Sequence, residues 1–358
     1  MQKVSKFIWA GVKLLVLCLC GALFVIVRYI LATPQPLESV LPGESHLYRW
    51  KRGHVFYKVT GDVAAPPIVL WHAPAIGGSG YEMRLLVEQL ARAYRVYIPD
   101  MLGFGLSDHP EGTYTASLYV ELYRDFLQDV VGQPAELVGS GLSANYCVEV
   151  AARNAELCTR LVLLSPLSLF GEHKRPLWLT FFLQNTLSGF FLYALATSRI
   201  LLRNSIAKRL RLASIYISSD ELEYTYAVAH QLGAQRAVLA LFAGYLDLPV
   251  SQRLATLQVP MLILWGEYVL QELYHTAPLS GQTQVETLSG AGTRPHEEQP
   301  HRIAGLILSA HLSSRPSDQA IETAKEVDTL IEPAQDQSPA SIVELPSSLF
   351  QPEVAAEA

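Results

Sequence analysis

The hydrophobic pattern divides this chain into parts of different physical character. Residues 7–32 form an apolar run that is interrupted only by Lys13 and Arg28. Farther along, short apolar runs alternate with longer amphipathic stretches, and from Ser313 onward the pattern loses its periodicity. Pro, Ser, Gln, Ala and acidic residues dominate that last part, which cannot bury enough apolar surface to fold. The predicted parts are a membrane anchor at residues 1–33, a linker at 34–45, a globular domain at 46–312 and a disordered acidic tail at 313–358.

Short apolar or alternating runs within the globular domain predict strands, and the stretches between them predict helices. Such strand–helix alternation is typical of a mostly parallel, twisted sheet with helices on both faces, which is an α/β fold. The strands are predicted at residues 54–59, 68–71, 137–138, 161–164, 262–265 and 284–292, with a further strand leading into the turn that begins at Pro99. The helices are predicted before residue 93, at 115–131, after the Gly-Ser-Gly turn at 139–141, and at 303–312.

A helical stretch interrupts this alternation between Ser165 and Val259. Residues 176–198 carry no charge, so a second membrane span must be considered there. A single crossing would place the strands before and after it on opposite sides of the membrane, although they must join one sheet. We therefore interpret these residues as part of a helical insertion that covers the sheet.

The first apolar run predicts a single-pass membrane anchor. Its uninterrupted core, residues 14–27, is short for a span, but the flanking Lys13 and Arg28 can snorkel and extend it to about 20 residues. The alternative is a signal peptide cleaved after Ala32, although Ile30 is larger than such cleavage sites prefer. An uncleaved anchor is the favoured interpretation.

The basic residues around this run predict its orientation. Lys3, Lys6 and Lys13 precede the apolar core, whereas only Arg28 follows it closely. The positive-inside rule therefore predicts a cytoplasmic N-terminus and an exported domain.

Charge and cysteine content exclude several classes of function. The formal net charge is −6, and the nine acidic and two basic residues from Ser313 onward leave about +1 for the rest. No basic patch indicates nucleic-acid binding. The four cysteines show neither metal-ligand nor disulfide spacing, so we expect ordinary thiols, no metal and no cofactor. These cysteines are Cys18, Cys20, Cys147 and Cys158.

Three motifs resemble the α/β-hydrolase superfamily. Residues 135–166 read as a strand, a Gly-Ser-Gly turn, a helix and a second strand, which is similar to the nucleophile elbow of that superfamily. The stretch WHAPAIGGSG from Trp71 resembles its oxyanion loop, and PDMLGFGLSD from Pro99 resembles a turn that follows the next strand. The resemblance covers residues 46–312 and implies a capped, epoxide-hydrolase- or esterase-like branch, with a helical cap at about 167–255.

The resemblance also assigns positions to the catalytic triad, and none holds a residue able to do the chemistry. Gly139 and Ser143 fill the small positions of the elbow, and the nucleophile position between them is Gly141. The acid position in the stretch from Trp265 is Val269, and the base position after Gly292 is Thr293. A serine hydrolase needs a nucleophile, a base and an orienting carboxylate at these three positions.

The oxyanion hole departs from the superfamily pattern as well. One of its backbone donors belongs to the position of Pro74, and proline has no N–H to donate. Losing one such donor costs about 3 kcal/mol of transition-state stabilisation. The second donor is the N–H of Leu142.

Five neighbouring residues are candidates to replace the missing groups, and each also has a structural interpretation. Ser140 and Ser143 flank the elbow, where Ser143 is expected to cap the following helix. Glu267 is two residues short of the acid position, and His296 belongs to the scaffold beside the base position. His72 lies in the oxyanion loop and is expected to shape it.

These observations favour a membrane-anchored α/β-hydrolase domain that binds rather than reacts. It would hold a small apolar ligand under the cap, or a protein partner on the cap. The alternative is a hydrolase of ester or lipid-like substrates, or a lyase, that uses rearranged residues. The cap is expected to rest on the membrane and face an apolar pocket, or else to pack against the body of the domain.

Overall fold

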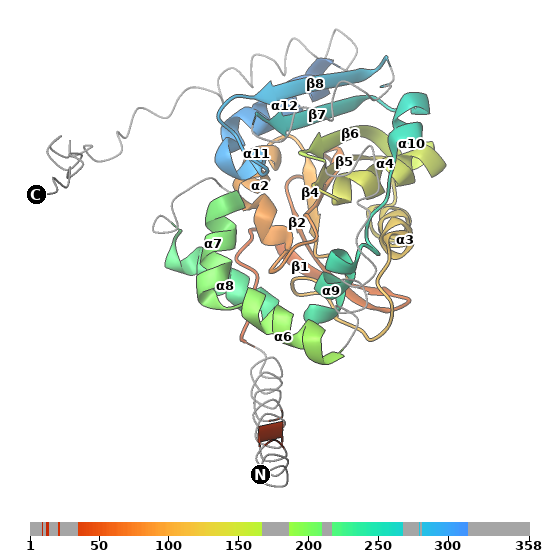
Figure 1. The fold of residues 1–358 in the computed structure, drawn as a ribbon. Coiled ribbons are helices and arrows are strands. Elements are labelled where there is room, and N and C mark those ends of the chain that lie inside the picture. The colour runs from red at the N-terminus through yellow and green to blue at the C-terminus, as the bar shows by residue number, and fades with distance from the viewer. Residues whose placement is uncertain are drawn as a thin grey trace, which may run out of the picture. The chain divides into compact units, whose positions relative to one another are not determined.

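The computed structural model describes residues 35–166, 186–209, 217–267, 279 and 281–313, together with residues 9, 12, 13 and 21 of the first apolar run. Its centre is one eight-stranded sheet (Figure 1). The strands are β1 (Glu44–Trp50), β2 (Gly53–Thr60), β3 (Pro67–Trp71), β4 (Arg95–Pro99), β5 (Ala135–Ser140), β6 (Cys158–Leu164), β7 (Met261–Gly266) and β8 (Thr283–Leu288).

The strand order is β1-β2-β4-β3-β5-β6-β7-β8. The strands from β4 to β8 are parallel, whereas β2 pairs with both β1 and β4 in the antiparallel sense. The predicted mostly parallel sheet is therefore confirmed. The first strand, β1, was not predicted; its alternating burial leaves one side exposed, as expected for a strand at the sheet edge.

Helices cover both faces of the sheet, as the alternation predicts. Figure 1 shows α2, α11 and α12 on one face and α3, α4 and α10 on the other. Their bounds are α2 (Arg84–Leu90), α3 (Ala116–Phe126), α4 (Ser143–Arg153), α10 (Ser251–Thr256), α11 (Pro295–Glu298) and α12 (Pro300–Ser313). Short turns of helix, η1 (Gly80–Met83), η2 (Leu127–Val131) and η3 (Ala155–Leu157), precede α2, continue α3 and follow α4.

The core lies between the central strands and the pair α3 and α4. Strands β3 and β5 are buried along their whole length, because helices cover both of their sides. Trp71 at the end of β3 stacks on Tyr123 of α3 with ring centroids 3.6 Å apart, and Phe126 meets the edge of the same indole. Burying each such side chain contributes about 1.5–3 kcal/mol. The same packing positions the carboxyl ends of β3 and β5, where the predicted site lies.

The helical insertion follows β6 and supplies α6 (Thr186–Ala196), α7 (Arg199–Arg209), α8 (Ser219–Ala229) and α9 (Gln235–Ala243). These helices form the cap. It contacts loops at the carboxyl ends of the strands: at Gly77, after β3, an added Cβ would lie 2.4 Å from the side chain of Thr225 on α8. The cap therefore packs on the body of the domain at the edge where the predicted site lies.

Several predictions fall outside the described residues. They concern most of the anchor at 1–33, residues 167–185 and 210–216 of the cap, Val269 at the acid position and the tail after Ser313. Among the residues that are described, no helix is both long enough and apolar enough to cross a membrane.

A buried ion pair links the two strands of the elbow unit to α12. Glu136 on β5 and Arg160 on β6 are direct neighbours in the sheet, and one guanidinium nitrogen of Arg160 lies 2.7 and 2.8 Å from the two carboxylate oxygens. The Tyr94 hydroxyl also donates to Glu136, and Arg160 donates to the backbone carbonyl of Ile307. Removing one partner of such a pair leaves the other charge buried without compensation.

We therefore expect Arg160→Met to lower the free energy of unfolding by about 3–5 kcal/mol, because the Glu136 carboxylate loses its charged partner. The double variant Glu136→Leu/Arg160→Met should recover most of that loss. Urea unfolding of the full chain, followed by tryptophan fluorescence, measures both. Lys51→Met removes the exposed Lys51–Glu121 pair and should cost no more than about 1 kcal/mol. An Arg160→Met effect as small as this control would contradict the expectation.

Candidate functional site

The candidate site lies at the carboxyl edge of the sheet, where loops after β3, β5 and β8 converge. This edge is where open α/β sheets bind their ligands. His72 and Pro74 follow β3, Gly141 and Leu142 follow β5, and Thr293 follows β8. The topology thus brings to one edge positions that lie far apart in the sequence.

The turn after β5 has the shape of a nucleophile elbow but carries no nucleophile at its tip. A Cβ on Gly139 would lie only 2.6 Å from the Cα of Ala144, so glycine lets the helix α4 pack directly on the strand. Gly141 has φ of 57°, and its N–H donates to the carbonyl of Leu164 at 2.9 Å. The tip of the elbow therefore holds the left-handed conformation, which glycine adopts without strain, and presents no side-chain group.

The hydroxyl of Ser143 is committed to structure. Its Oγ donates to the backbone carbonyl of His72 at 2.6 Å and accepts from the Tyr123 hydroxyl at 2.9 Å, and the side chain is fully buried. The expectation that Ser143 caps the helix is wrong: the N-cap of α4 is Leu142, which makes no side-chain cap. Instead of capping the helix, the hydroxyl hydrogen-bonds to the loop after β3 and so holds the elbow against that loop.

His72 is held in one tautomer by its two neighbours. Its Nε2 accepts from the backbone N–H of Met101 at 3.0 Å, and its Nδ1 lies 3.0 Å from the carbonyl of Ala73, to which it must donate. Burial lowers the pKa of this imidazole, although Asp100 and Glu82 oppose the shift. With both ring nitrogens engaged, His72 shapes the loop and is not free to accept a proton from a substrate.

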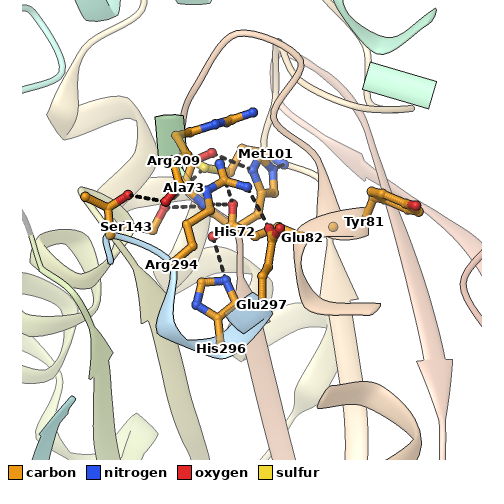
Figure 2. A network of polar contacts seen from close by, with 12 residues as sticks. His72, Ala73, Tyr81, Glu82, Met101, Ser143, Arg209, Arg294, His296 and Glu297 are labelled. Carbon is orange, nitrogen blue, oxygen red and sulfur yellow. Dashed lines mark hydrogen bonds and ion pairs between the residues drawn. The ribbon is translucent and has the colours of Figure 1, made fainter. Parts of the chain in front are cut away.

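A buried carboxylate, Glu82 of η1, joins the segments of the site (Figure 2). Its Oε2 accepts from the N–H of Ala73 at 3.0 Å and lies 3.3 Å from a guanidinium nitrogen of Arg294. Its Oε1 lies 3.1 Å from Nε2 of His296, and Ser140 helps to lower the pKa of this carboxyl. His296, one of the five candidate substitutes, is therefore a partner of this structural charge.

The surroundings of Glu82 favour its ionised form. Burial by itself would raise the pKa of this carboxyl, but Arg294, with help from His296 and Ser140, holds the pKa well below its usual range. A carboxylate with so low a pKa is a weak general base.

The ionic contacts continue toward the cap. Arg84 of α2 lies 3.7 Å from Glu221 of α8 and 3.6 Å from Glu297 of α11, and Glu297 also accepts from Arg294 at 2.8 Å. Burial lowers the pKa of the Arg209 guanidinium, at the end of α7, to about 10, so it remains a cation at neutral pH. Together with Gly77 and Gly78, these side chains line a cavity of about 20 Å³, room for about one water molecule.

The remaining predicted positions make other contacts. The hydroxyl of Thr293, at the base position, donates to the backbone carbonyl of Arg209 at 3.4 Å and links the loop after β8 to the cap. Glu267 accepts from the backbone N–H of Gly290 at 2.7 Å and joins the loops after β7 and β8. Pro74 is buried in the loop after β3, and Val269 lies outside the described residues.

Sequence reasoning missed three residues of this region. Glu82 lies in an ordinary helical stretch and gave no signal, whereas Arg294, the charge beside the base position, could have been noted. Ser165, directly after β6, was also missed. Among the described residues it is the one non-glycine with positive φ, at 40°, and its buried hydroxyl has no hydrogen-bond partner there.

The described part of the chain contains neither a metal-binding cluster nor a disulfide. It contains no group of three or more His, Cys, Asp or Glu side chains that could hold a metal ion. Cys147 and Cys158 are free and buried, as predicted, and burial raises the pKa of both thiols. The other two cysteines lie outside the described residues.

Comparisons with known proteins agree with the fold described above. Over 280 residues the chain is 25% identical to an uncharacterised protein of Mycobacterium tuberculosis, covering 73% of this chain and 79% of that protein. It is 22% identical to the carboxylesterase YbfK of Bacillus subtilis, covering 79% and 93% of the two chains. Its fold is similar to that of a meta-cleavage product hydrolase of Pseudomonas fluorescens, with a TM-score of 0.61, 20% identity, and coverage of 76% and 98%.

Residues 68–306 match the family described as the alpha/beta hydrolase family. That match extends from β3 to α12 and so includes the elbow, the cap and the loops of the site. From the matched residues and the sheet together, we conclude that this chain belongs to the alpha/beta hydrolase family.

Proposed function

We propose that this protein is a non-catalytic member of its family, a binding or scaffold protein held at a membrane by its first apolar run. The observation that carries the proposal is Gly141. It stands at the tip of an elbow whose backbone geometry is intact, so the position of the nucleophile is occupied by a residue with no side chain. Acyl transfer by this fold needs a side-chain nucleophile at that position.

The contacts around the elbow support the same proposal. The Ser143 hydroxyl is hydrogen-bonded to the backbone carbonyl of His72 and to the Tyr123 hydroxyl. His72 has both ring nitrogens engaged. A hydroxyl or imidazole that already satisfies a buried polar group cannot be recruited without leaving that group unpaired, which costs about 1–3 kcal/mol.

The cap carries the binding role in this proposal. Its ligand is a small apolar molecule held under the cap, or a protein that docks on the cap. The ion pair between Arg84 of α2 and Glu221 of α8 links the cap to the body, so a ligand would lie between two packed layers.

A second candidate function is hydrolysis of ester or lipid-like substrates by rearranged residues. The names of the similar proteins favour it, because they include a carboxylesterase and a meta-cleavage product hydrolase. Ser165 is the residue to examine for it. A strained residue with an unpaired buried hydroxyl beside the elbow is the kind of feature that functional sites retain.

The two candidates differ in their reaction with serine-directed probes. We expect the full chain neither to be labelled by a fluorophosphonate nor to hydrolyse p-nitrophenyl esters above a heat-denatured control, since no activated hydroxyl is available. In-gel fluorescence and absorbance measure the two reactions, with an active carboxylesterase as the positive control.

Labelling of the wild-type chain would favour the second candidate, and serine-to-alanine variants would locate the nucleophile. Ser140→Ala, Ser143→Ala and Ser165→Ala are compared, each after its thermal unfolding shows a folded protein. Loss of labelling in one of them would contradict the non-catalytic proposal.

The proposal also predicts what is needed to restore activity. Gly141→Ser alone should stay inactive, because a serine without a base is a weak nucleophile. Adding Val269→Asp and Thr293→His should give measurable ester hydrolysis. Replacing Pro74 by glycine as well should raise the rate by at least about tenfold, because the oxyanion regains a backbone donor. Initial rates with p-nitrophenyl butyrate measure each step.

The matched control carries Gly141→Ala with the same three further changes. Alanine imposes the same backbone strain at positive φ, about 1–3 kcal/mol, but provides no hydroxyl. Equal ester hydrolysis by this control and the serine variant would show that the activity arises elsewhere. Hydrolysis by Gly141→Ser alone, as fast as with all four changes, would show that a base is already present.

A further inference from the structure

The cap presents an exposed face that is both apolar and basic. It is made by α6 and the adjoining α7 and is called here the apolar–basic face. Its apolar members are exposed by 40–75%, far more than core residues of similar size. The face consists of Phe191, Leu195, Arg199, Ile200, Leu201 and Lys208.

Helix geometry explains why these side chains stay exposed. Phe191 and Leu195 are four residues apart and therefore share one side of α6. Tyr193, halfway between them, lies on the other side, where it is buried and donates its hydroxyl to the carbonyl of Ala229 at the end of α8. One side of α6 thus packs on the cap, and the opposite side leaves large apolar groups uncovered.

The charged residues of α6 and α7 are all basic, although an exposed acid of α8, Glu223, pairs with one of them. The helix α6 contains no charged residue, and Arg199 and Lys208 lie near the two ends of α7. Arg199 is paired with Glu223, and its guanidinium also covers the ring of Tyr226. Large apolar groups flanked by Arg and Lys are typical of helices that lie in the interface of an anionic bilayer.

The chain enters the domain next to this face. The side chain of Gln231, two residues beyond α8, donates to the backbone carbonyl of Gln35 at 2.8 Å. Gln35 is three residues past the apolar run 7–32, so at most about 11 Å of chain separates its carbonyl from the end of that run. Ala229, the partner of α6, is two residues before Gln231. A membrane anchor at 7–32 would therefore leave the bilayer beside α6.

We propose that the apolar–basic face lies in the headgroup region of an anionic phospholipid bilayer, to which residues 7–32 anchor the chain. The short tether restricts the cap to the membrane surface, where the apolar side chains of α6 and α7 can enter to a depth of about 5–10 Å. This docking does not depend on whether the domain is catalytic, because none of the residues of the face belongs to the elbow or to the Glu82 contacts.

Site-specific fluorescence of the full chain in vesicles tests this inference. Ile200→Cys is labelled with an environment-sensitive nitrobenzoxadiazole dye, in a chain with Cys18 and Cys20 replaced by alanine; Cys147 and Cys158 are buried. The matched control is Val63→Cys, an equally exposed apolar residue in the turn after β2, 78% against 75%. Both are reconstituted in phosphatidylcholine–phosphatidylglycerol vesicles, with and without lipids that carry a spin label near the headgroup.

The expected result is a shift of the emission of position 200 to shorter wavelength and loss of most of its intensity with spin-labelled lipid, while position 63 emits as in water. Phe191→Ser/Leu195→Ser/Leu201→Ser should abolish both changes at position 200. Failure of the chain to remain with the vesicles would overturn the proposal. A blue shift at position 200 without quenching would also overturn it, because a protein partner or second copy would then cover the face.

Discussion

A carboxylate can be buried in a folded protein only if other groups satisfy it, and Glu82 draws its partners from two segments of the candidate site that lie far apart in the sequence. The loop after β3 supplies the N–H of Ala73, and the segment after β8 supplies Arg294 and His296. Removing Arg294 would leave the buried carboxylate without its cationic partner. The arrangement of the carboxyl edge therefore depends on this one ionised group, which joins loops that are distant in the sequence.

The elbow depends on packing rather than on chemistry. Direct contact between the backbone of α4 and β5 at Gly139 forces the turn, and Ser143 secures it to the carbonyl of His72. Neither contact involves the side chain at position 141. The shape of a nucleophile elbow therefore does not require a nucleophilic side chain at its tip, because packing at Gly139 and Ser143 maintains the turn. The same reasoning explains how a family relationship to hydrolases is compatible with a proposed binding role.

The cap connects the two proposals. On its inner side, Glu221 and Thr293 take part in contacts that hold α7 and α8 on the body of the domain. On its outer side, α6 and α7 leave large apolar residues exposed beside the point where the chain enters. If the outer side lies in lipid as proposed, the cap is held from both sides, by the Arg84–Glu221 pair and by the bilayer.

The sequence by itself determined the parallel sheet, the covering helices and the position of the elbow, because period-2 and period-3.6 patterns and a Gly-Ser-Gly turn are local signals. It also predicts that Gly141, Thr293 and Pro74 depart from the triad and the oxyanion hole, because those positions can be compared with intact flanking motifs. It did not reveal the role of Glu82 or Arg294, or that Ser143 binds the loop after β3 instead of capping its helix. Only the tertiary structure decided these points, since hydrogen bonds and ion pairs between the segments that follow β3, β5 and β8 join residues whose separation in the chain carries no pattern.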